Sequence, residues 1–264
     1  AYTAWWQKDS KLSAPKNSNL KTVMDFSFFD KINTAKNEQT ETWFKGLDRI
    51  YNNFVYDFLY PNPASVLAFI ENHDTDRFLG EGDNLPMLKQ ASTLLLTTRR
   101  IPQLYYGTEV MMNGVKSKSD GYVRKDFPGG WTGDATNALT PAGRTKIQNE
   151  CYDFYKTILN WRKGNDVIAK GNMVQFMVQN GVYAYARQYE GKTVFVMLNG
   201  TDAETTVPLK FYKEILKNSK QGRATFLPIS AIKSKTFDLG NAEKQAGFLS
   251  IASDLVDCDK IYQN

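Results

Sequence analysis

The chain has few of the residues that build metal centres and covalent cross-links. Its 264 residues include one histidine, His73, and two cysteines, Cys151 and Cys258. A zinc site with several histidines is therefore excluded, as is more than one histidine-based catalytic centre. Two distant cysteines form neither a disulfide framework nor a CxxC metal motif. We expect no metal site and no cofactor.

Long apolar runs are also missing. No uninterrupted stretch reaches the roughly 18 apolar residues of a transmembrane helix, so neither a membrane span nor a signal peptide is expected. Because the chain begins with Ala1 and not Met, we expect it to be processed or truncated. Its net charge of +5 is spread along the sequence, which argues against a nucleic-acid partner. The composition, 42% hydrophobic and 23% charged, is that of a globular protein of one large domain or two.

Apolar runs in the first part of the chain predict buried strands at 22–26, 65–70 and 101–106. Helical spacing predicts helices over 39–60 and 85–99, the first with a core-facing stripe from Trp43 to Phe58. Strands that alternate with helices predict a parallel α/β sheet. Residues 107–139 predict a long loop without regular structure, and a helix is predicted to open at Thr140-Pro141 and to end before Gly164.

The pattern changes after Gly164. Strand-like runs at 174–179, 182–189 and 192–198 are joined by Asn180-Gly181 and Glu190-Gly191, which predicts an antiparallel meander. Further strands are predicted at 225–229 and 247–252. We therefore expect two domains, residues 1–164 and residues 165–264.

A cluster of polar side chains follows the predicted strand at 65–70. The segment Glu71–Arg77 contains the single histidine, and ligands of parallel α/β sheets bind at the carboxyl ends of the strands. One alternative is a loop that caps the next helix, with Asp74 in an Asx turn. Another is a metal site of His73, Asp74 and Asp76, although one imidazole with loop acids is a weak ligand set.

Four segments resemble a known family. Phe69-Ile-Glu-Asn-His-Asp74 with Arg77 is similar to the fourth conserved region of the alpha-amylase family of glycoside hydrolases, which ends strand seven of a (β/α)8 barrel. Ile101–Glu109 resembles the strand-eight segment, with Arg100 where the family usually has glycine. Lys21–Phe26 resembles strand six, and Asp120–Arg124 the D-x-x-x-R loop, of the neopullulanase and cyclomaltodextrinase branch.

The resemblance covers residues 1 to about 217 and implies the fold class. We expect an α/β fold in which residues 1–164 form part of a (β/α)8 TIM barrel, strands six to eight. A small all-β antiparallel sandwich domain over residues 165–264 would follow.

The resemblance also implies roles for side chains. Asp74 would be the carboxylate that stabilises the transition state, by binding the 2-OH and 3-OH of the sugar being cleaved. His73 would donate to a hydroxyl of the same sugar, and Asn72 would orient the turn. Asp120 and Arg124 would bind a sugar nearer the non-reducing end, with a solvated salt bridge as the alternative.

Two tryptophans in predicted loops, Trp6 and Trp131, are candidates to stack on sugar faces. Neither the family's G-x-R-x-D nucleophile motif nor its G-E-x-W-like general-acid segment occurs in the sequence. The resemblance therefore implies the C-terminal half of a retaining hydrolase of α-1,4-glucans, namely maltooligosaccharides, cyclodextrins, pullulan or starch. We expect this chain alone to be inactive.

The expected partners are α-glucan oligosaccharides and either the missing N-terminal half of the barrel or another copy of the chain. The resemblance suggests a bacterial periplasm or cytoplasm and leaves calcium in the full-length parent open. One alternative function is a non-catalytic amylase-like carbohydrate-binding protein, and another is an unrelated α/β binding module. Transglycosylation would use the same residues as hydrolysis.

Overall fold

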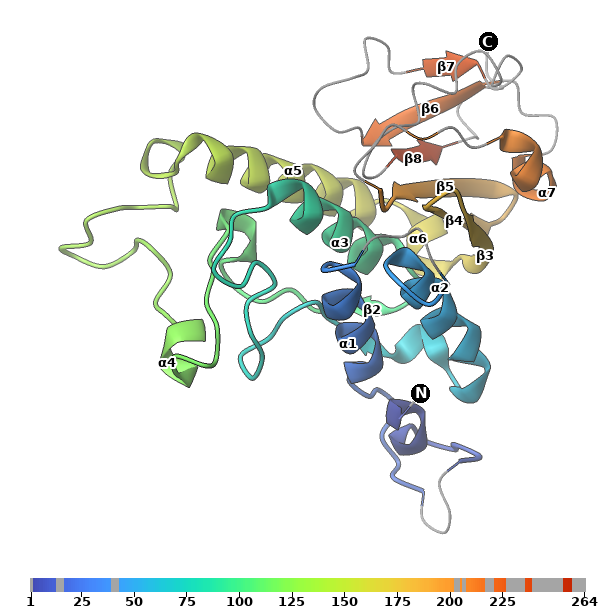
Figure 1. Cartoon of the computed structure of the whole chain (residues 1–264), viewed down its shortest axis with the longest axis horizontal. Coiled ribbons are helices and arrows are strands. Elements are labelled where there is room, and N and C mark those ends of the chain that lie inside the picture. The colour runs from blue at the N-terminus through green and yellow to red at the C-terminus, as the bar shows by residue number, and fades with distance from the viewer. Residues whose placement is uncertain are drawn as a thin grey trace.

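A computed structural model describes residues 2–12, 17–38, 43–201, 205, 208–216, 221–226, 236–238 and 254–257. Figure 1 shows two parts: helices around a short parallel sheet, followed by an antiparallel sheet at the upper right. Among the described helices, none has the length and apolar character needed to cross a bilayer.

The parallel sheet follows the predicted order of strands. β1 (Leu67–Ala68) pairs in parallel with β2 (Ile101–Pro102), and Met24 forms a parallel bridge to Leu67. Parallel pairing of the three predicted runs is thus confirmed. The regular strands are much shorter than those runs, and the residues that flank β1, Val66, Phe69 and Ile70, are buried.

The longest described helices are α1 (Phe26–Ala35), α2 (Leu47–Val55), α3 (Leu85–Thr97) and α5 (Lys146–Lys163), and their buried side chains share one hydrophobic cluster with Ala68 of β1. The sequence did not predict α1. It begins there because the Asp25 carboxylate accepts a hydrogen bond from the Phe28 amide at 2.9 Å, which caps the helix. The shorter helices are η1 (Tyr2–Trp6), η2 (Tyr56–Leu59), η3 (Pro63–Ser65), η4 (Thr108–Val110), α4 (Asp120–Val123), η5 (Pro141–Gly143), α6 (Asp166–Lys170), η6 (Leu209–Tyr212) and α7 (Lys213–Leu216).

The helix predicted over 39–60 is shorter in the structure, and residues 39–42 lie outside the described residues. Ile50 and Phe54 on its stripe are buried as predicted. The prediction that Trp43 and Phe58 also face the core is wrong, since they are 78% and 77% exposed. Trp43 precedes the helix, and Phe58 lies in η2, where tighter 3₁₀ winding changes the face that each residue presents.

Two other predictions need correction. The loop predicted over 107–139 contains η4 and α4. Thr140-Pro141 opens only the short η5, and the long helix α5 begins at Lys146. A capping box between Thr145 and Gln148 sets that start, because each side chain binds the other residue's backbone amide. Gly164 ends the helix as predicted.

The antiparallel sheet begins with the predicted meander of β3 (Asn172–Gln179), β4 (Val182–Tyr189) and β5 (Lys192–Asn199). Its full order is β3-β4-β5-β8-β6-β7, so β8 (Asp254–Asp257) lies between β5 and β6 (Gln221–Phe226). β7 (Thr236–Asp238) forms the outer edge. The strand predicted at 225–229 overlaps β6 at 225–226, while the strand predicted at 247–252 lies outside the described residues.

One hydrophobic core runs through both parts. Buried side chains of α2, α3 and α5 belong to the same cluster as Tyr183 and Val196 of the antiparallel sheet. A polar contact adds to this packing, since the Arg187 guanidinium donates to the Thr97 carbonyl at 2.9 Å. The antiparallel sheet is therefore packed against the helices and not merely tethered to them.

A buried ionic cluster lies between the parallel sheet and the first two helices. Arg100, just before β2, has its Nη1 against the Asp25 carboxylate and donates from Nη2 to Asp57 Oδ1 at 2.5 Å. Its guanidinium carbon is 4.9 Å from the centroid of the Phe54 ring. Asp57 is also paired with Arg99. The cluster ties the start of β2 to the helix cap at Asp25 and to η2.

Candidate functional site

The turn that follows β1 is organised by Asn72. Its buried side chain accepts a hydrogen bond from the Asp74 amide at 2.8 Å. The Asn72 amide donates to Thr75 Oγ1 at 3.0 Å, and the Thr75 amide donates to the Asn72 carbonyl at 3.3 Å. The Asx turn is therefore made by Asn72 and not by Asp74, which leaves the Asp74 side chain available for other contacts.

Asp74 and His73 lie at the surface of this turn. The side chains are 56% and 58% exposed, and His73 Nε2 is 3.2 Å from Asp74 Oδ2. The other carboxylate oxygen, Oδ1, is 3.0 Å from Arg124 Nη2. A solvent-accessible carboxylate is thus flanked by the His73 imidazole and accepts a hydrogen bond from Arg124.

Arg124 joins this turn to a segment about fifty residues later in the chain. Its Nε donates to the His73 carbonyl at 2.8 Å, and its Nη2 is 3.2 Å from Asp120 Oδ2. Asp120 opens α4, which Figure 1 shows at the tip of a long connection away from the sheets. The Asp120–Arg124 ion pair does form, and its arginine also contacts Asp74. The structure therefore brings Asn72, His73, Asp74, Asp120 and Arg124 together.

Two buried charges beneath the turn had no role in the sequence prediction. Glu71 accepts from the Phe78 amide at 2.5 Å and from the Thr108 hydroxyl, and its Oε1 is 3.5 Å from Arg77 Nη1. Burial raises the pKa of Glu71. The signal in the sequence was a pair of opposite charges, Glu71 and Arg77, between the apolar residues Ile70 and Phe78. Ile70 and Phe78 are both buried.

Arg77 connects the turn to the rest of the site. Its side chain is 0% exposed, and it donates to the Tyr106 carbonyl at 2.6 Å and to the Val123 carbonyl at 3.1 Å. Its guanidinium carbon lies 3.9 Å from the centroid of the Tyr105 ring. Through Val123, the residue before Arg124, Arg77 also supports the second half of the exposed cluster.

Trp6 and Trp131 are both strongly exposed, as expected for side chains available to a ligand. The backbone of each makes a local hydrogen bond. The Trp131 amide donates to Asp134 Oδ2 at 2.9 Å, and the Trp6 carbonyl accepts from the Ser18 hydroxyl. These contacts do not link either ring to the Asp74 cluster.

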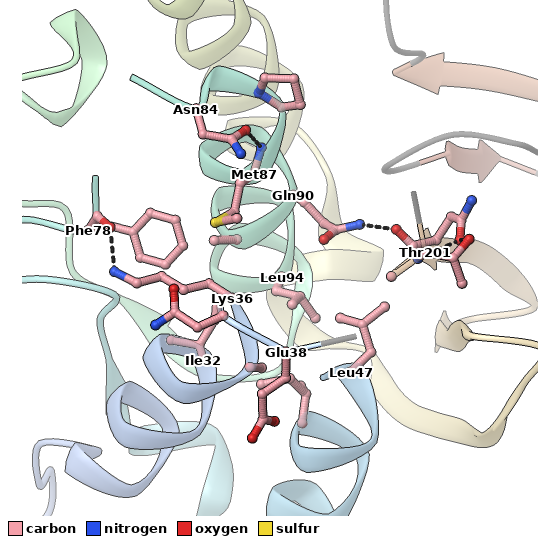
Figure 2. A pocket seen from close by; sticks show the side chains of 17 residues that line it. Ile32, Lys36, Glu38, Leu47, Phe78, Asn84, Met87, Gln90, Leu94 and Thr201 are labelled. Atoms are coloured by element: carbon pink, nitrogen blue, oxygen red, sulfur yellow. Dashed lines mark hydrogen bonds between the residues drawn. The ribbon is translucent and has the colours of Figure 1, made fainter. Parts of the chain in front are cut away.

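A cavity of about 420 Å³ lies between α1, α2, α3 and residues 199–201 (Figure 2). Its polar walls already have internal partners: Lys36 Nζ donates to the Phe78 carbonyl at 2.6 Å, and Gln90 donates to the Asn199 carbonyl at 2.7 Å. Burial lowers the pKa of Lys36. No predicted site residue is among its described lining residues. The cavity is thus separate from the exposed cluster, and Lys36 holds the far end of the Glu71–Phe78 segment.

Metal and thiol chemistry find no support in the described part of the chain. No group of three or more His, Cys, Asp or Glu side chains there is arranged to hold a metal ion, and this applies to the alternative of His73, Asp74 and Asp76. Burial raises the pKa of the Cys151 thiol to about 12, which makes it a poor nucleophile. Cys258 lies outside the described residues.

Comparison with known proteins gives consistent relatives. Residues 173–241 match the family model of the cyclo-malto-dextrinase C-terminal domain. The chain is 28% identical to an alpha-amylase of Niallia circulans over 85% of its length, and 29% identical to a cyclomaltodextrin glucanotransferase of Thermoanaerobacterium thermosulfurigenes over 79%.

Solved structures show the same fold. The alpha-amylase of Geobacillus thermoleovorans, complexed with acarbose, superimposes with a TM-score of 0.64 at 19% identity and covers 91% of this chain. The alpha-amylase of H. orenii gives a TM-score of 0.58 at 17% identity over 90% of the chain. The chain spans 40% and 27% of the two relatives compared by sequence, and 48% and 49% of these two structures.

Proposed function

We propose that this chain, whose relatives support membership of the alpha-amylase family, contributes the transition-state-stabilising carboxylate of a retaining α-glucan hydrolase. The single observation that carries the proposal is the exposed Asp74 carboxylate, held 3.2 Å from His73 Nε2 and 3.0 Å from Arg124 Nη2. The proposed substrates are α-1,4-glucans, as for enzymes of the neopullulanase and cyclomaltodextrinase branch. Two relatives support this class, since their names are alpha-amylase and cyclomaltodextrin glucanotransferase.

The proposal assigns the two parts of the chain as domains. Residues 1–164 form the C-terminal part of a (β/α)8 barrel, with Met24, β1 and β2 in its strands six to eight. Residues 165–264 form the C-terminal all-β domain. The parallel pairing of Met24, Leu67 and Ile101 and the antiparallel sheet that follows support this assignment.

The chemistry of the cluster suits an oxocarbenium-like transition state. A carboxylate offers about four acceptor positions, and the Arg124 guanidinium donates to one of those of Asp74, at 3.0 Å from Oδ1. The remaining positions accept hydrogen bonds from two adjacent sugar hydroxyls. These bonds strengthen as the sugar ring flattens and gains positive charge. They therefore lower the activation barrier of glycosidic bond cleavage more than they tighten ground-state binding.

The other predicted residues extend this binding site. Asp120 and Arg124 bind a sugar nearer the non-reducing end, and Trp6 and Trp131 offer exposed rings for stacking. No segment of the chain carries the nucleophile or general-acid motif of the family. The proposal therefore places those two carboxylates outside this chain, and the chain alone binds sugar without cleaving it.

The proposal is tested by following His73, which as the single histidine gives one set of imidazole NMR signals. We expect maltotriose or an acarbose-type inhibitor to shift these signals. Asp74→Asn should weaken binding of the acarbose-type inhibitor, whose flattened, cationic ring resembles the transition state, roughly tenfold or more, and binding of maltotriose less, because it removes charge-assisted hydrogen bonds. Asp166→Asn is the matched control, because Asp166 is an exposed aspartate of α6 that pairs with Lys170.

Two results would contradict the proposal. Signals of His73 that do not respond to either sugar would favour an unrelated α/β binding module. Release of glucose or maltose by rigorously purified chain would show that the missing carboxylates are not needed, and would refute their placement outside it.

The parallel sheet leaves an apolar surface that calls for a partner. Ile101, Leu104 and Tyr106 on and after β2 are exposed, and β2 is an edge of the described sheet. We propose that the rest of the barrel covers this surface, and that in its absence a second copy of the chain does so. Light scattering should therefore report a dimer or larger species, and Ile101→Asp should shift it towards monomer. A monomeric wild-type chain that is free of any second polypeptide would refute this.

A further inference from the structure

We infer that Lys116 is a positioning residue for Asp74, an inference that rests on the proposed function. Lys116 lies between the motifs Ile101–Glu109 and Asp120–Arg124 and belongs to neither of them. Its ammonium group donates to the Asp74 carbonyl at 2.9 Å, and its backbone amide donates to Asp76 Oδ1 at 2.6 Å. One residue thus binds the turn from both its side chain and its backbone.

The Lys116 side chain binds the second of the two peptide groups that flank the Asp74 side chain. On the amide side, Asn72 Oδ1 accepts from Asp74 at 2.8 Å, and on the carbonyl side Lys116 donates. With both peptide groups bound, the direction in which the side chain leaves the backbone is restricted. A carboxylate that must meet two hydroxyls in the transition state gains from such restriction.

Lys116 also acts on Arg124 through Asp120. The two oxygens of Asp120 are divided between the cations, with Oδ1 3.2 Å from Lys116 Nζ and Oδ2 3.2 Å from Arg124 Nη2. Asp120 therefore holds both cations close to each other, and each of them donates to a carbonyl of the turn. Loss of Lys116 would free one oxygen of Asp120 and let the carboxylate rotate away from Arg124.

The ionic groups are all partly exposed, so each pair alone adds little to global stability. The effect of Lys116 is accordingly expected in the local geometry and not in the melting temperature. A change in local geometry at an unchanged melting temperature distinguishes a positioning role from a structural one. Local geometry is therefore the quantity to measure.

The test compares three variants of the free protein: Lys116→Met, Lys116→Arg and Lys118→Met. Lys118 is the matched control, because it lies on the same loop but pairs with Glu81 and Tyr122. We expect Lys116→Met to shift the His73 imidazole signals and to speed hydrogen exchange of the Asp74 amide roughly threefold to tenfold. Lys116→Arg should restore both, since a guanidinium also donates to a carbonyl and a carboxylate.

Sugar binding provides the second readout. Lys116→Met should weaken the affinity for the acarbose-type inhibitor roughly threefold to tenfold, while Lys118→Met binds like the wild type. Wild-type amide exchange and wild-type His73 signals in Lys116→Met would overturn the inference. If the wild-type chain binds no sugar, the proposed function fails, yet the measurements on the free protein still decide the role of Lys116.

Discussion

Replacing Arg77 with methionine is expected to lower the free energy of unfolding by about 3–5 kcal/mol, because it leaves a buried acid without its cation. Arg77 and Glu71 are both buried, with Nη1 and Oε1 3.5 Å apart. The same substitution removes the hydrogen bonds to the Tyr106 and Val123 carbonyls. Urea unfolding followed by tryptophan fluorescence measures the loss.

Arg124→Met provides the matched control for Arg77. Arg124 belongs to the same site, but its side chain is partly exposed, so its removal should cost about 1 kcal/mol or less. Combining Glu71→Gln with Arg77→Met should recover part of the stability, since no unpaired charge is then buried. If Arg77→Met unfolds at the same urea concentration as the wild type, the buried pair is not a support of the site.

Arg100→Met should cause a loss of similar size, about 3–5 kcal/mol near pH 8, for a different reason. Arg100 is the shared cation of two buried acids, Asp25 and Asp57. Without it, Asp57 keeps Arg99, while Asp25 loses the cation against its Oδ2. Burial lowers the pKa of Arg100 to about 9, so the arginine is charged at neutral pH and the pair is ionic.

The loss from Arg100→Met should depend on pH in a defined direction. Burial raises the pKa of Asp57 from 3.8 to about 6, against the opposing effect of Arg99. Because Arg100 also donates to Asp57 Oδ1, we expect its removal to raise this pKa further. Between pH 4 and the pKa of Asp57 in the folded variant, folded Asp57 holds a proton that it has released in the unfolded chain. Its stability therefore falls as the pH rises through this window, and the substitution should cost more at pH 8 than at pH 5.

Unfolding curves of wild type and variant at pH 5 and pH 8 check this prediction. Arg49→Met is a suitable control, because the Arg49–Glu38 pair lies nearer the surface and should cost about 1 kcal/mol or less. Equal losses at both pH values would mean that removal of Arg100 does not raise the pKa of Asp57.

The course of the chain could be predicted where one local pattern dominates. The apolar runs around Met24, Leu67 and Ile101 were sufficient for the parallel order, and Asn180-Gly181 for the first hairpin. The helix α1 was missed because Phe26, Phe28 and Phe29 continue an apolar run, while the decision between strand and helix is made by the Asp25 cap.

The residues of the site also fall into those that a local sequence pattern predicts and those that it does not. Asn72, His73 and Asp74 stand together in the sequence, so a polar cluster at a strand end was enough to single them out. The contribution of Lys116 could not be predicted, because it contacts the backbone of a residue 42 positions away. The importance of Glu71 and Arg77 depends on their burial beneath Thr108 and Tyr105, which only the folded chain reveals.

The position of β8 in the antiparallel sheet has a consequence for synthesis of the chain. Residues 254–257 leave the ribosome after β6 and β7, yet they pair with β5 on one side and β6 on the other. Until they emerge, the β3–β5 meander and the β6–β7 hairpin are separate units with open edges. Joining them closes a loop of more than fifty residues, which makes this step slow compared with hairpin formation. Newly made chains thus pass through a stage in which two strand edges are open to association with neighbouring nascent chains.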